Sequence, residues 1–174
     1  VAVDKVAASG GYMMACIANQ IIAAPFAIIG SIGVVYQMPN FSKLLHKKSV
    51  DFEQITAGEY KRTLTMFGEN TDKGRKKVQE DIDEIQVLFK DHVKNYRDQL
   101  DMDKVATGEH WFGTQALKLN LVDSLKTSDD LIVEARDAHD IYHIEYRQKE
   151  KLGKKLAHSL SNLYATVMHG YDHA

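Results

Sequence analysis

The chain opens on Val1-Ala2-Val3-Asp4-Lys5-Val6-Ala7-Ala8-Ser9-Gly10-Gly11, and this segment sets the expected architecture. Val1 to Val6 is apolar and β-branched enough for a short buried strand, and the small residues from Ala7 to Gly11 permit a tight reversal after it. The elements expected next are a helix over 11–18, a strand over 20–24 and an extended segment over 28–35. Strand, helix and strand make a βαβ unit, so we predict a layered α/β domain whose sheet is at least partly parallel.

The longest expected element is a helix over 72–100. Apolar residues recur there at steps of three or four, which is the pattern of an amphipathic helix. They are Val78, Ile82, Ile85, Phe89, Val93, Tyr96 and Leu100. Shorter elements are expected as helices over 40–48, 113–120 and 128–139 and as strands over 52–56 and 141–146.

Length and composition fit one globular domain. The chain has 174 residues, 44% hydrophobic and 26% charged, and its net charge of −2 gives no reason to expect nucleic-acid binding. Cys16 is the only cysteine, so no disulfide can form within the chain, and we expect it to be a small core residue. No apolar run reaches the length of about 18 residues that indicates a transmembrane helix. The start at Val1, with no initiator Met or signal peptide, indicates a piece of a longer protein.

The composition shifts at Lys149. We therefore divide the chain into a main domain over 1–148 and a C-terminal segment over 149–174. In that segment a helical stripe of apolar residues accompanies a cluster of four lysines, namely Lys149, Lys151, Lys154 and Lys155. Two interpretations stay open: a terminal helix docked on its own domain or on a neighbouring subunit, and a basic amphipathic segment on a membrane surface.

Ser9 is the first candidate for chemistry, because it stands between an expected strand and helix and two glycines follow it. Its hydroxyl is expected at an exposed turn, where the Gly10 N–H at the helix N-terminus can stabilise negative charge on a carbonyl oxygen. The arrangement resembles a nucleophile elbow, with Ala7 in place of the first glycine of Gly-x-Ser-x-Gly. A serine that only caps the helix is the alternative.

A serine nucleophile needs a base. None of the eight histidines lies in a recognisable Ser-His-Asp site, and we expect no metal site at His139 and His143, whose surroundings alternate like a strand. A lysine can serve instead, although an ordinary lysine pKa of about 10.4 has to fall to roughly 7–8, at a cost of about 4 kcal/mol. Lys61 could be placed for this role between an expected strand and the long helix, while a solvated lysine is the simpler interpretation of the residues alone.

Successive motifs then match one family. They are Asp4-Lys5-Val6-Ala7-Ala8-Ser9-Gly10-Gly11-Tyr12, Ala24-Pro25, Gly30-Ser31-Ile32-Gly33-Val34, Gly58-Glu59-Tyr60-Lys61-Arg62, Thr107-Gly108-Glu109-His110-Trp111 and Leu121-Val122-Asp123. Up to about Glu150 the chain resembles the S49 peptidases, the family of the signal peptide peptidases, and most of all their SohB-type members. Lys61 follows Ser9 by 52 residues, at the spacing of that family.

The resemblance implies the roles of the site residues. It makes Ser9 the nucleophile, Lys61 the general base, the Gly10 N–H one oxyanion donor and Ser31 the residue that orients the lysine. The family's second oxyanion donor comes from a glycine upstream of the first residue here, so a fragment alone is expected to have an incomplete oxyanion hole. No metal and no organic cofactor is implied.

The resemblance also implies a fold, partners and a location. These are a ClpP/crotonase-type fold, a ring-like homo-oligomer whose neighbouring subunits complete each other's sites, and hydrophobic peptide substrates such as signal-peptide or membrane-protein remnants. A membrane anchor upstream is expected to hold the catalytic domain on the periplasmic side of a bacterial inner membrane. Two rivals are a crotonase-type acyl-CoA enzyme, whose acidic site residues have no counterpart in this sequence, and a non-catalytic scaffold.

Overall fold

The computed structural model describes residues 1–146. Residues 1–138 form one compact unit, and residue 139 begins a second unit, in whose described part, residues 139–146, there is no helix or strand. The strand expected over 141–146 is therefore wrong. The predicted boundary at 148 and the C-terminal segment over 149–174 lie outside the described residues.

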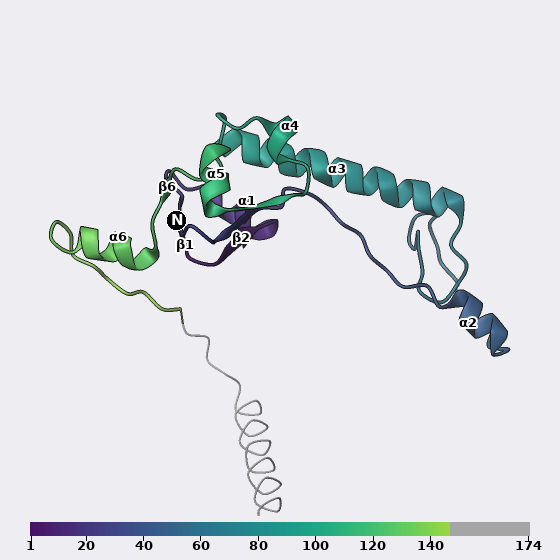
Figure 1. The fold of residues 1–174 in the computed structure, drawn as a ribbon. Coiled ribbons are helices and arrows are strands. Elements are labelled where there is room, and N and C mark those ends of the chain that lie inside the picture. The colour runs from purple at the N-terminus through teal and green to yellow at the C-terminus, as the bar shows by residue number, and fades with distance from the viewer. Residues whose placement is uncertain (147–174) are drawn as a thin grey trace, which may run out of the picture. The chain divides into compact units, whose positions relative to one another are not determined.

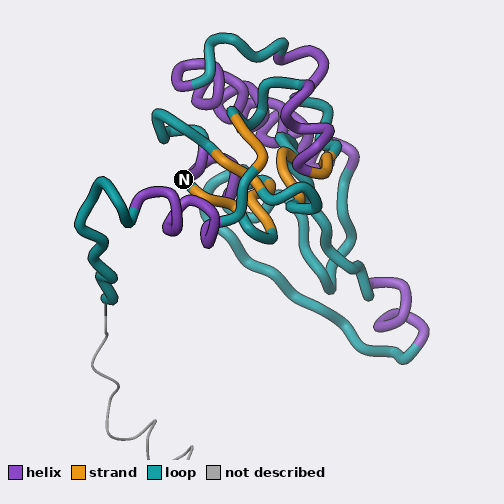
Figure 2. The backbone as a smooth tube through the Cα atoms, turned by 60° about the vertical axis from the view of Figure 1, so that its left-hand side comes forward, coloured by secondary structure: helices purple, strands orange, loops and turns teal. Residues whose placement is uncertain are grey.

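Two small sheets form the centre of the first unit (Figure 2). In one sheet, β1 (Ala2–Val3) and β6 (Ser124–Leu125) both pair in parallel with β3 (Ile22–Ala23). In the other, β4 (Ile28–Gly30) pairs in parallel with β2 (Val6–Ala8) and antiparallel with β5 (His110–Phe112). The prediction of an α/β domain with a partly parallel sheet is confirmed.

The strand expected over 1–6 is broken at Asp4. Its carboxylate accepts hydrogen bonds from the backbone N–H of Ser128, at 2.8 Å, and from the Ser128 hydroxyl. These hydrogen bonds lower the pKa of Asp4 below its ordinary value. The break sends β1 and β2 into different sheets and leaves Ala8 as the last strand residue before Ser9.

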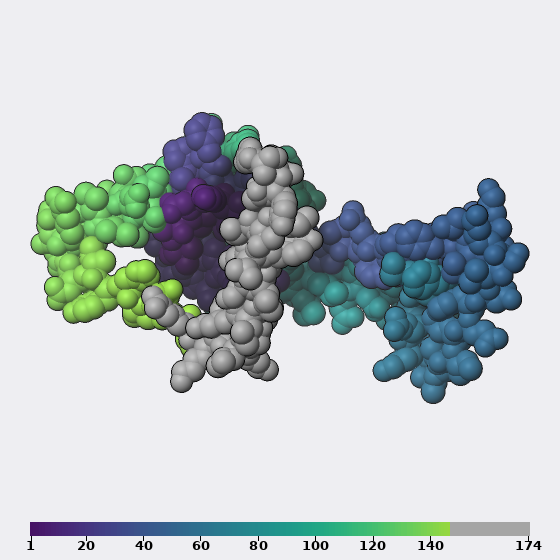
Figure 3. All heavy atoms as spheres, turned by 90° about the horizontal axis from the view of Figure 1, so that it is seen from below, coloured from purple at the N-terminus to yellow at the C-terminus, as the bar shows by residue number. Residues whose placement is uncertain are grey.

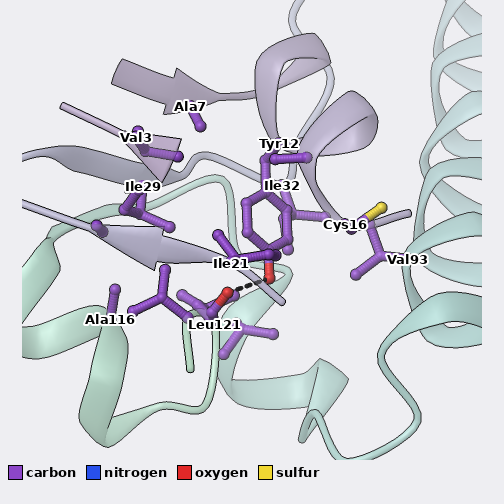
Figure 4. Packing of buried hydrophobic residues seen from close by; sticks show 14 of the residues in the cluster. Val3, Ala7, Tyr12, Cys16, Ile21, Ile29, Ile32, Val93, Ala116 and Leu121 are labelled. Carbon is purple, nitrogen blue, oxygen red and sulfur yellow. Dashed lines mark hydrogen bonds between the residues drawn. The ribbon is translucent and has the colours of Figure 1, made fainter. Parts of the chain in front are cut away.

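The core lies around α1 (Gly10–Ala15) and the strands (Figure 4). Tyr12 is completely buried, and its hydroxyl donates to the backbone oxygen of Leu121 at 2.8 Å, so the polar end of this large side chain is satisfied. Burial raises the pKa of the Tyr12 hydroxyl. Cys16 is also completely buried, as predicted.

The long helix α3 (Asp72–Tyr96) confirms the strongest helix prediction, although it ends four residues earlier than expected (Figure 1). It begins where the Thr71 hydroxyl accepts the Gly74 N–H at 3.1 Å. The expected apolar stripe is only partly buried: Phe89 and Val93 are in the core, whereas Ile85 is 50% exposed and Tyr96 is 55% exposed.

A partly buried ion pair fixes the end of α3. The guanidinium of Arg97 donates to both carboxylate oxygens of Asp123, at 2.8 and 3.0 Å, and to the backbone oxygen of Asn120 at 3.0 Å. Asp123 also accepts the backbone N–H of Ile21 at 2.7 Å. This cluster ties the last turn of α3 to the loop before β6 and to the start of β3.

Residues 36–71, which we call the arm, connect the strands to α3 (Figure 1). The arm contains α2 (Ser42–Lys47), as predicted, and is held by stacking of Phe41 on Phe67, with ring centroids 6.1 Å apart. The strand expected over 52–56 is wrong, because these residues form an exposed loop without a strand partner. In the space-filling view the arm, in blue, stands clear of the purple N-terminal strands (Figure 3).

Three further helices complete the described elements. They are α4 (Met102–Val105), α5 (Gly113–Lys118) and α6 (Ser128–Ala135). The predictions for α5 and α6 are confirmed with shorter limits, whereas α4, β5 and β6 were not expected. Gly113 starts α5 against a strand end, where an added Cβ would lie 2.2 Å from the Ala24 backbone oxygen.

Candidate active site

Ser9 occupies a strained turn between β2 and α1. Its φ of 52° and ψ of −121° lie in a region that residues other than glycine rarely adopt, and such strain is concentrated at functional sites. Two backbone hydrogen bonds hold the turn: Ser9 N–H donates to Gly30 O at 2.8 Å, and Met13 N–H donates to Ser9 O at 3.0 Å. The residue is exposed.

The hydroxyl of Ser9 makes no capping hydrogen bond to α1. The alternative that this serine merely caps the helix is therefore wrong. The hydroxyl is left available at the N-terminus of α1, where Gly10 is the first residue and the opening N–H groups have no partner within the helix. An added Cβ at Gly10 would meet no atom within 4 Å, so the space beside this residue is open.

Ser31 lies beside Ser9 at the same end of the sheet. Ala8 of β2 is in register with Gly30 of β4, so the two serines are the next residues along two parallel neighbouring strands. Ser31 also has a positive φ, of 50°, and its backbone N–H donates to Glu109 O at 2.8 Å. The parallel pairing therefore places two serines, both with a positive φ, side by side at one sheet edge.

A cleft of about 500 Å³ contains both serines. Its other walls are the segment after Ser31, one face of α3 and the loop before β5. The lining residues are Gly33, Val34, Val35, Gln79, Ile82, Asp83, Gln86, Ala106, Thr107 and Gly108. Among these lining residues, the one ionisable side chain is that of Asp83.

The α3 wall of the cleft was not expected from the sequence. Ile82 and Asp83 each lie three or four residues from both Gln79 and Gln86, so the four residues share one helix face. Only Ile82 belongs to the apolar stripe that predicts the helix. The polar residues at the same spacing are the signal that could have indicated a second functional face.

Lys61 is not among the residues that line this cleft. It lies exposed in the arm, where its backbone N–H donates to Gly58 O at 3.2 Å. The residues next to it anchor this part of the arm on the first turns of α3, because Glu59 forms an ion pair with Lys73 and the Tyr60 ring lies 5.8 Å from Lys77 Nζ. Within residues 1–146, the Lys61 ammonium has no recorded hydrogen bond or ion pair. Within one chain, Ser9 and Ser31 therefore lie in the same cleft, whereas Lys61 lies outside it.

Comparison with known proteins decides the family. Residues 1–142 match the model for peptidase family S49. The chain belongs to family S49. The matched residues include both serines of the cleft and the lysine of the arm.

Relatives within the family cover almost the whole chain. A protein of Haemophilus influenzae named probable protease SohB is 54% identical over 172 residues, which is 99% of this chain and 49% of the relative. A probable protease SohB of Buchnera aphidicola subsp. Acyrthosiphon pisum is 52% identical over 169 residues, which is 97% of this chain and 50% of the relative. The chain thus spans about half the length of these S49 relatives.

The described part of this S49 chain contains neither a candidate membrane-spanning helix nor a candidate metal site. Over residues 1–146, no helix is long and apolar enough to cross a membrane. The same residues contain no cluster of three or more His, Cys, Asp or Glu side chains that could hold a metal ion.

Proposed function

We propose that this chain is the catalytic part of a serine endopeptidase in which Ser9 is the nucleophile and Lys61 is the general base. The observation that carries the proposal is the strained, exposed Ser9 with an uncommitted hydroxyl at the head of a cleft. Membership of a peptidase family supports peptide-bond hydrolysis as the reaction of this serine. We further propose a ClpP/crotonase-type fold for the complete domain.

The reaction would proceed through an acyl-enzyme. The Lys61 amine takes the proton of the Ser9 hydroxyl while the oxygen attacks the carbonyl carbon of the peptide bond. The Gly10 N–H donates to the resulting oxyanion. The C–N bond then breaks as Lys61 returns the proton to the leaving amine, and a water molecule attacks the ester by the same proton transfers and frees Ser9.

Two copies of the chain would share each site. The separation of Lys61 from the Ser9 cleft within one chain supports this arrangement, because a base must lie within hydrogen-bond reach of the proton that it removes. The arm carries Lys61 together with exposed apolar side chains, among them Ile55 at 96% exposure and Tyr60 at 50%. Such a surface is suited to contact with a neighbouring subunit. We propose a closed homo-oligomer in which the arm of one copy delivers Lys61 to the cleft of the next.

The proposed substrates are hydrophobic peptides, such as remnants of signal peptides or membrane proteins. Val34, Val35 and Ile82 give the cleft apolar wall surface that supports this choice. We also propose that the natural protein is anchored in a bacterial inner membrane with this domain on the periplasmic side. Family resemblance is the support for the anchor and the location.

Mixing of inactive variants tests the shared site. The full natural protein is co-expressed as Ser9→Ala and Lys61→Ala copies carrying different tags, and cleavage of an internally quenched apolar peptide is measured. Each variant alone should be inactive, whereas random one-to-one mixing in a ring should restore about a quarter of the sites. Mixtures that stay inactive, with mixed oligomers confirmed by both tags, would place the dyad within one chain. Cleavage by both single variants at the wild-type rate would exclude the dyad, and absence of cleavage by the wild-type oligomer would favour the scaffold or another enzyme class.

A further inference from the structure

Gln86 reaches from α3 to the two backbone segments that form other walls of the Ser9 cleft. Its Nε2 donates to Ala106 O at 3.1 Å and to Ile32 O at 3.4 Å. Both neighbours are carbonyl oxygens, so the nitrogen of the amide has to face them. One side chain thus links the segment after Ser31 to the loop before β5.

These two segments meet backbone to backbone. Gly108 N–H donates to Ile32 O at 3.1 Å, and a Cβ added at Gly33 would lie 2.7 Å from Gly108 Cα. No side chain fits between the two glycines, so side-chain packing cannot set their separation. Gln86, on the α3 wall of the cleft, donates hydrogen bonds to both of these segments where they meet.

The other end of the same amide is unsatisfied. Gln86 Oε1 is buried and has no hydrogen-bond partner among the described residues. An unpaired buried acceptor lowers stability, and the two hydrogen bonds of the amide nitrogen have to offset this cost. The amide at this position is therefore explained by the two backbone carbonyl groups that its nitrogen holds in place.

We propose that Gln86 is a positioning residue of the peptidase site. Its amide fixes the backbone on which Ser31 stands and thereby fixes the direction of the Ser31 hydroxyl. The inference rests on the proposed function, in which Ser31 orients Lys61. A serine hydroxyl that donates to the neutral amine of the lysine favours the deprotonated base, so displacement of Ser31 both slows the reaction and raises the pH at which the base becomes active.

The test uses a serine-directed fluorophosphonate probe on the full natural protein. Probe concentration and pH are varied to give the maximal labelling rate, the probe affinity and the pH midpoint of labelling. Gln86→Met removes the amide and keeps the length of the side chain. The matched control is Gln115→Met, which also removes a glutamine bonded to backbone, since Gln115 Oε1 accepts the Phe112 N–H at 3.0 Å outside the cleft.

Gln86→Met is expected to lower the maximal labelling rate by about 10- to 100-fold with little change in probe affinity. Its pH midpoint should rise by about half a unit or more. Gln115→Met should shift the unfolding temperature only. Wild-type rate and midpoint in Gln86→Met would overturn the inference while leaving the dyad intact.

Two further outcomes are decisive. If Ser9→Ala is labelled at another serine, or Lys61→Ala is labelled at Ser9, as strongly as the wild type is labelled, the proposed function fails and the inference fails with it. If Gln86→Met does not assemble, Gln86→Asn keeps a polar amide in a side chain that is too short for both contacts, and it should show the same slower labelling and higher midpoint. Wild-type labelling by Gln86→Asn, or failure of both variants to fold, would make Gln86 a structural residue and overturn its positioning role.

Discussion

Replacement of Arg97 by methionine tests how the end of α3 is held in the fold. The Arg97 side chain is only 4% exposed and donates three hydrogen bonds, two to Asp123 and one to Asn120 O. Loss of one member of a fully buried ion pair costs about 3–5 kcal/mol. The Asp123 side chain retains 31% exposure, so water can replace part of what it loses. We therefore expect Arg97→Met to lower the free energy of unfolding by about 2–3 kcal/mol.

Urea unfolding followed by circular dichroism measures this loss. The midpoint should fall by about 1 M or more while the slope stays unchanged. A double-mutant cycle with Asp123→Asn separates the pair from the packing of the arginine stem, and a coupling energy of about 1 kcal/mol or more is expected. A loss below about 0.5 kcal/mol for Arg97→Met, or a double variant whose loss equals the sum of the singles, would refute the reasoning.

Three further predictions concern the same unit. Gly113→Ala should destabilise the protein by about 1–3 kcal/mol in thermal unfolding, because the new Cβ would lie 2.2 Å from a backbone oxygen. The control is Gly11→Ala, which should be neutral or stabilising because its Cβ would meet no atom within 4 Å. Equal effects of the two substitutions would contradict the close contact at Gly113. Hydrogen bonds from Arg97 lower the pKa of the Asp123 carboxyl, so its stabilisation is complete above the unfolded pKa of about 4 and is lost as pH falls through the folded value. The stability gap between wild type and Asp123→Asn should therefore close in acid urea titrations, and a gap that is constant with pH would argue against the pair. Tyr12→Phe should cost about 1–2 kcal/mol through the lost 2.8 Å hydrogen bond, and an unchanged urea midpoint would show that the bond contributes nothing.

The sequence predicts an element correctly where a local pattern of residues determines it. The small residues around Ser9 predict the turn, and the long apolar periodicity predicts α3. Register and sheet partners depend on contacts distant in sequence. The first strand is divided between two sheets at Asp4, which accepts hydrogen bonds from Ser128, and no local pattern in residues 1–6 predicts this contact.

The wrong strands have a physical explanation as well. Residues 52–56 and 141–146 carry β-forming side chains, but a strand requires pairing with another strand, and neither segment belongs to the two sheets of residues 1–146. Short elements such as β5 and β6 have too few residues to show a period.

Some residues of the candidate site could be predicted from the sequence, and others could not. Ser9 and Ser31 were both identifiable from motifs, and their parallel strands explain why they lie side by side. Gln86 was missed because its role depends on two carbonyl groups, 54 and 20 residues away along the chain. The position of Lys61 in the arm is a property of tertiary structure that the motif spacing does not specify. The roles of Ser9, Gly10, Ser31 and Lys61 in catalysis stay predictions.

The pH dependence of serine labelling tests the central claim most directly. The full natural protein is treated with the fluorophosphonate probe from about pH 6 to about pH 10, beside Ser9→Ala and Lys61→Ala, and the labelled residue is identified by mass spectrometry. The account predicts labelling of Ser9 that rises with pH through a single midpoint and is abolished in both variants. Absence of labelling in a folded wild-type oligomer, or labelling of Ser9 that survives loss of Lys61, would contradict it.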